Sequence, residues 1–223
     1  MEAAYHLGEA GQTDRAFDLL LPLTEWLHAR GRYLEDIDML AGLTAPWTLG
    51  PRNEGLFAIL QGDAWTGLGD LQKAAAWQQH AIDCLGSLAA ADPSNAGWQR
   101  DLSVSLNRIG DLKSAQGDLA GALAAYQQSQ GIRERLAAAD PSNAGWQVDV
   151  AVSCWKLAET HGAGSAEGRA LVEKGLSILL DLQAAARLTK AQQDWIALFQ
   201  QALRGDDRGP WHRRLRAWLA RSR

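Results

Sequence analysis

Three acidic side chains stand at a constant interval along the chain, because Asp63, Asp111 and Glu159 follow one another at steps of 48 residues. If the chain repeats a structural unit with this period, the three carboxylates form a row on one surface. Such a row favours a basic or amine-bearing partner over an acidic one. The competing interpretation is that they are solvated charges on helix faces that contact nothing.

Residues suited to metal or nucleophilic chemistry are scattered along the sequence. The five histidines form no HExxH or HxH motif, so the sequence indicates no metal site and no cofactor. Cys84 and Cys154 have no CxxC spacing and are expected to be buried thiols of a reducing compartment, with a disulfide as the alternative. No GxSxG motif prepares a serine nucleophile, and we predict a protein that is not an enzyme.

The 48-residue interval rests on a literal duplication. Residues 88–99 and 136–147 both read LAAADPSNAGWQ, and Ala74, Ala122 and Ala170 keep the same step. The repeated unit is therefore a whole structural module that stacks on copies of itself.

The elements that position these residues are predicted to be helices. Nearly every segment carries apolar residues at helical spacing, and none shows the alternation of a strand, which predicts an all-α fold of about 10 or 11 helices. Glycine turns alternate with Asp-Pro-Ser-Asn turns, in which Asn95 and Asn143 can cap the next helix. We expect helices at 2–9, 13–29, 33–43, 52–67, 71–90, 96–115, 119–138, 144–161, 166–187, 190–204 and 210–221.

The chain divides into four predicted segments. Residues 1–43 are degenerate helical repeats, and 44–51 form a linker rich in proline and glycine. Three units of 48-residue period follow at 52–187, and 188–223 are expected to be C-terminal capping helices, opened by a capping box of Thr189 and Gln192.

The middle unit resembles a tetratricopeptide (TPR) repeat with a long period. The small residues Gly110 and Ala122 allow two antiparallel helices to approach closely, and larger residues fill the space around them. The residues that carry the resemblance are Leu106, Ile109, Gly110, Gly117-Asp118, Ala122 and Tyr126. The resemblance implies a right-handed superhelical α-solenoid of antiparallel helix pairs. The chain is also similar to the C-terminal repeat region of bacterial signal-transduction NTPases.

In this family the first helix of each pair lines a concave groove that binds a peptide or a partner helix. The resemblance therefore implies a non-enzymatic protein-protein interaction scaffold, or alternatively a sensor fragment of a larger signalling protein. The groove residues that it implies are Ile59, Asp63, Thr66, Asn107, Asp111, Ser114, Trp155 and Glu159.

The end of the chain offers a possible second surface. Its apolar and basic residues are typical of an amphipathic basic helix: Trp211, Arg213, Arg214, Leu215 and Trp218. One interpretation is a helix that caps the solenoid. The alternatives are a membrane- or nucleic-acid-targeting module, or a segment that occupies the acidic groove of a neighbouring chain and causes self-association.

Composition limits the partners. A formal net charge of −4 and a pI near 5.7 argue against a chain-wide surface for nucleic acid or anionic membrane, so neither partner is expected. No segment approaches 18 apolar residues without charge, and the expected location is the cytoplasm. The expected partner is a protein or peptide, with a basic one favoured.

Overall fold

The structure, a computed structural model, describes residues 2–44 and 48–205, and all regular structure in these residues is helical. This confirms the all-α prediction, and the helices pack with their neighbours in sequence as a solenoid-like fold does. The right-handed superhelical sense stays a prediction. The chain forms two compact units, Met1–Gln116 and Gly117–Arg223, whose boundary falls inside the predicted repeat array of 52–187.

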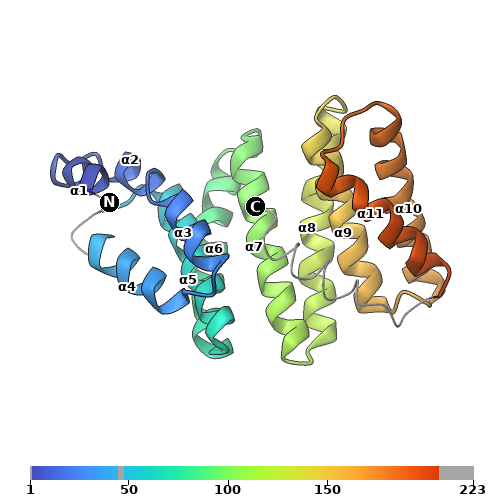
Figure 1. The fold of residues 1–223 in the computed structure, drawn as a ribbon, viewed down its shortest axis with the longest axis horizontal. Helices are drawn as coiled ribbons and strands as arrows, with labels where there is room; N and C mark the ends of the chain where they lie inside the picture. The colour runs from blue at the N-terminus through green and yellow to red at the C-terminus, as the bar shows by residue number, and fades with distance from the viewer. Residues whose placement is uncertain (1, 45–47, 206–223) are drawn as a thin grey trace. The chain divides into compact units, whose positions relative to one another are not determined.

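The described part of unit 1 has four shorter helices followed by three longer ones (Figure 1). The four are α1 (Glu2–Glu9), α2 (Thr13–Asp18), α3 (Leu21–His28) and α4 (Tyr33–Thr44). The three are α5 (Pro51–Leu68), α6 (Leu71–Ala91) and α7 (Ala96–Ala115). Helix α5 packs against both α6 and α7.

The described part of unit 2 also consists of helices joined by short turns. Its helices are α8 (Leu119–Ala139), α9 (Ala144–His161), α10 (Ala166–Ala184) and α11 (Lys190–Leu203). Each packs against the next in sequence. The helix predicted at 210–221 lies outside the described residues.

The single helix predicted at 13–29 is wrong, because the chain forms α2 and α3 with a break at Leu19 and Leu20. Pro22 stands in the first turn of α3. Proline has no N–H to donate to the carbonyl four residues earlier, and its ring clashes with that carbonyl. A continuous helix through this position is therefore disfavoured, and the chain starts a new one.

The predicted caps are confirmed. Asn95 accepts a hydrogen bond from the Trp98 backbone N–H at 3.1 Å, and Asn143 accepts one from Trp146 at 3.1 Å. Thr189 forms the complete capping box with Gln192. These side chains satisfy N–H groups that the first helical turn leaves unpaired, which fixes where α7, α9 and α11 begin.

The N-terminal helices of unit 1 are tied to the start of α5. The Gly50 N–H donates to Asp14 Oδ1 at 2.9 Å, and Asn53 Nδ2 donates to the Asp14 carbonyl at 3.3 Å. A β-carbon at Gly50 would lie 2.6 Å from Asp14 Oδ2, so a larger residue here would require the Asp14 carboxylate to shift. Thr13 adds a bond from its hydroxyl to the Thr48 carbonyl at 2.8 Å.

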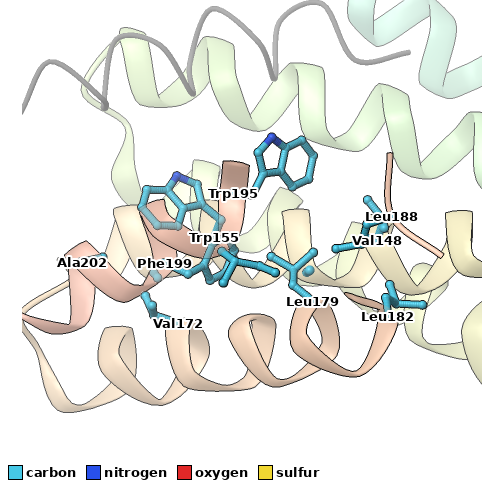
Figure 2. Packing of buried hydrophobic residues seen from close by; sticks show 12 residues of the cluster. Val148, Trp155, Val172, Leu179, Leu182, Leu188, Trp195, Phe199 and Ala202 are labelled. Carbon is cyan, nitrogen blue, oxygen red and sulfur yellow. The ribbon is translucent and has the colours of Figure 1, made fainter. Parts of the chain in front are cut away.

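The largest apolar cluster of unit 2 joins α9, α10 and α11 (Figure 2). Trp155 of α9 packs against Phe199 of α11 with ring centroids 4.9 Å apart, and both side chains are almost fully buried. Leu179 of α10 completes the contact between the three helices. Helix α11 thus covers the apolar side of the α9–α10 pair.

Within the described residues, no helix combines the length and the apolar content needed to cross a membrane.

Candidate functional site

The residues predicted to line a groove begin on α5, where Ile59, Asp63 and Thr66 have the spacing of one helix face. Ile59 is only 5% exposed and belongs to an apolar cluster. Asp63 is partly exposed and Thr66 is exposed, with its hydroxyl donating to the Gly62 carbonyl at 2.8 Å. A partner that approaches this face can contact Asp63 and Thr66, while Ile59 packs in the apolar core.

Helix α7 presents the equivalent positions of the next repeat. Asn107 is 8% exposed and therefore buried, Asp111 is partly exposed, and Ser114 is exposed. Both helices thus bury the first predicted position and expose the last. We use the term α5–α7 face for the accessible residues Asp63, Thr66, Asp111 and Ser114.

The Asp63 carboxylate is held between two other helices. Its Oδ1 lies 3.2 Å from Arg108 Nε of α7 and accepts a hydrogen bond from Gln78 Nε2 of α6 at 3.2 Å. The side chains of Arg108 and Asp63 are 12% and 14% exposed, and Gln78 is fully buried. Asp63 therefore has a basic partner on α7, so it is not a solvated charge that contacts nothing.

A second ion pair joins the same two helices with the charges reversed. Arg52 of α5 places Nε 2.8 Å from Asp101 Oδ2 of α7. Each helix thus contributes one acid and one arginine, and the two pairs fix α7 against α5. The charges of these two ion pairs balance one another.

Unit 2 carries the remaining predicted groove residues, on α9. Trp155 is 2% exposed because α11 covers it through Phe199, so this tryptophan is a core residue and not a surface contact. That part of the predicted groove is corrected. Glu159 is partly exposed and interacts with other groups of the protein.

The second surface was predicted at the end of the chain. Its residues Trp211, Arg213, Arg214, Leu215 and Trp218 all lie outside the described part of the chain.

The structure also brings together three side chains that the sequence analysis did not connect. Glu54 of α5 lies beside His80 and Cys84 of α6, with potential ligand atoms within 4.8 Å of one another. Cys84 is partly exposed, contrary to its predicted burial, whereas Cys154 is buried as predicted. The four-residue step from His80 to Cys84, which puts both on one helix face, is the signal that could have revealed the group.

Comparisons with known proteins show similarity of fold. No family model and no curated protein matches the chain. The chain is similar to the crystal structure of BtubC (BKLC) from P. vanneervenii, with a TM-score of 0.67 and 14% sequence identity. The similarity covers 99% of this chain and 86% of that chain.

This similarity corrects the prediction that the chain is not an enzyme. Almost the whole chain shares its fold with BtubC, and at 14% identity the likeness carries the fold alone. It gives no ground for excluding catalysis, since one fold hosts many activities. The exclusion is therefore withdrawn.

Proposed function

We propose that the protein is an interaction scaffold that holds a peptide or helix of a partner protein against the α5–α7 face. The observation that carries the proposal is the placement of two first helices side by side, with Thr66 and Ser114 exposed at equivalent positions. Stacked helix pairs provide such extended binding surfaces. The TPR resemblance of residues 96–138 supports the same function.

The ion pair between Asp63 and Arg108 bears on how a partner binds. A basic side chain of the partner would compete with Arg108 for Asp63, so its electrostatic gain is only the difference between two ion pairs. We therefore expect shape and hydrogen bonds at Thr66 and Ser114 to contribute more than net charge. The preference for a basic partner stays a prediction, as does self-association.

The cytoplasm remains the proposed compartment. Cys84 and Cys154 are both free thiols, which is typical of proteins in reducing compartments.

The proposal is tested by blocking the face without disturbing the core. Thr66→Arg together with Ser114→Arg places two long charged side chains at exposed positions. We expect partner capture from native lysate of the source cells to fall by about tenfold or more, because the added groups occupy the space of the bound segment. Capture is measured by quantitative mass spectrometry with the full chain as bait.

A matched variant controls for the added charge. Gln72→Arg with Ala76→Arg adds the same two charges at exposed positions of α6. This protein should capture the same partners as the wild type. Equal capture by both double variants would remove the α5–α7 face as the binding surface, provided that both keep the wild-type circular dichroism spectrum.

A further inference from the structure

Three side chains of types that ligate metal ions converge where α5 packs against α6. His80 Nε2 lies 3.1 Å from Glu54 Oε1, and Cys84 Sγ lies 3.8 Å from the same nitrogen. Ligands that surround one tetrahedral zinc ion at about 2.0–2.3 Å are roughly 3–4 Å from one another. The two separations from His80 fall in this range, and all three residues offer ligand atoms within 4.8 Å of one another.

The two helices place these residues for simple geometric reasons. His80 and Cys84 are four residues apart on α6, so their side chains lie on one face of the helix. Glu54 stands in the first turn of α5, which runs antiparallel to α6 and packs closely against it. The Trp77 ring contacts His80 edge-on with centroids 6.2 Å apart, and this contact orients the imidazole.

The position of the thiol beside the imidazole differs from that in a catalytic relay. In a Cys-His-acid relay, the thiol and the carboxylate contact opposite nitrogens of the imidazole. Here the carboxylate lies 3.1 Å from Nε2, whereas the Cys84 sulfur lies 3.8 Å from Nε2 and 4.0 Å from Nδ1, so the thiol is not aligned with the nitrogen opposite the carboxylate.

We propose that Glu54, His80 and Cys84 bind a divalent transition-metal ion of the Zn²⁺ class, a site that is separate from the α5–α7 face. The mixed oxygen, nitrogen and sulfur ligands suit Zn²⁺ or Co²⁺ better than Mg²⁺ or Ca²⁺, which prefer oxygen alone. The carboxylate and the thiolate together balance the two charges of the ion. Binding converts the thiol to a metal-bound thiolate and releases its proton to solvent.

The surroundings favour a cation with an open coordination position. The negative charges of Glu54 and Asp83 act on the Cys84 side chain. The same charges attract a positive ion to this position. The Glu54 and His80 side chains are 49% and 42% exposed, so the ion can enter from solvent and a water molecule can complete the tetrahedron.

Cobalt titration of the reduced full-length protein tests the site. A Co²⁺–thiolate bond gives a charge-transfer absorption in the near ultraviolet that bonds to nitrogen and oxygen do not give. We expect this absorption to saturate at one Co²⁺ per chain and to disappear when one equivalent of Zn²⁺ displaces the cobalt.

Variants of the two cysteines assign the bond. Cys84→Ala should abolish the absorption, whereas Cys154→Ala, at the other cysteine, should retain it. Glu54→Gln should keep the absorption but weaken Co²⁺ binding by about tenfold or more, because one anionic ligand is lost. A wild-type protein without the absorption at millimolar Co²⁺, or a Cys84→Ala protein that retains it, would overturn the proposal.

Discussion

Asp63 shows how one carboxylate can connect three helices. A single oxygen, Oδ1, contacts Arg108 of α7 and Gln78 of α6, while the residue itself belongs to α5. Because Arg108 and Asp63 are mostly shielded from water, their attraction is screened less than that of a surface pair. This carboxylate therefore stabilises the contact between repeats as well as lying on the proposed binding face.

A double-mutant cycle measures that contribution. With Asp63→Asn and Arg108→Gln, singly and together, we expect a coupling energy of about 1–2 kcal/mol in urea unfolding. The exposed pair of Arg32 and Glu35, three residues apart on the surface, serves as the control and should give less than about 0.5 kcal/mol. Equal coupling energies for the two pairs would contradict the account.

The buried Cys154 thiol should make the unfolding free energy depend on pH. Burial raises the pKa of this thiol to about 11 in the folded protein. A raised pKa means that the stabilisation is complete below the pKa of the unfolded thiol and is lost as the pH rises through the folded value. Between pH 7.5 and pH 10.5, the wild type should lose about 2 kcal/mol more unfolding free energy than Cys154→Ala. Urea unfolding at both pH values measures this loss, and an equal loss in the two proteins would refute the prediction.

At the scale of the elements, glycines set how closely α5 and α6 approach. A β-carbon at Gly55 would lie 2.6 Å from Leu85 Cγ, and Leu85 is fully buried. At Gly86 the nearest atom to such a carbon would be Leu102 Cδ1 at 3.9 Å, an ordinary contact. Two glycines inside neighbouring helices therefore differ in what they allow.

Alanine at these two positions should have opposite effects. We expect Gly86→Ala to raise the unfolding free energy by up to about 1 kcal/mol, through better helix propensity. Gly55→Ala should lower it by about 1–3 kcal/mol, because the added methyl group overpacks the interface with Leu85. Thermal and urea unfolding measure both, and a stabilising Gly55→Ala would show that α5 and α6 do not pack this closely.

Local signals predicted most helix boundaries, whereas contacts between helices were not predictable. Caps such as Asn143 and Thr189 act within a few residues of themselves, so the sequence pattern contains their whole geometry. The apolar spacing of residues 13–29 continues across Pro22, so it conceals the break that the missing N–H of Pro22 favours. The contact of Asp63 with Arg108, and that of Glu54 with His80, depend on the rotation of each helix about its axis, which no local pattern determines.

At the scale of the whole molecule, the 48-residue repeat preserves position but not environment. Three equivalent positions are occupied by Gln78 and Tyr126, which are both buried, and by Lys174, which is half-exposed. Gln78 binds Asp63, whereas Lys174 pairs with Glu134 on the neighbouring α8 at 2.6 Å. Because equivalent residues have different contacts, each repeat can contribute differently to a bound partner.

Photo-crosslinking in the source cell tests most directly whether the α5–α7 face contacts a partner. A photoreactive amino acid is placed singly at Thr66, at Ser114 or, as the control, at Gln72 of α6, all exposed positions. We expect Thr66 and Ser114 to crosslink to the same protein, and Gln72 not to crosslink to it. Crosslinks of equal yield from Gln72, or none from Thr66 and Ser114, would contradict it.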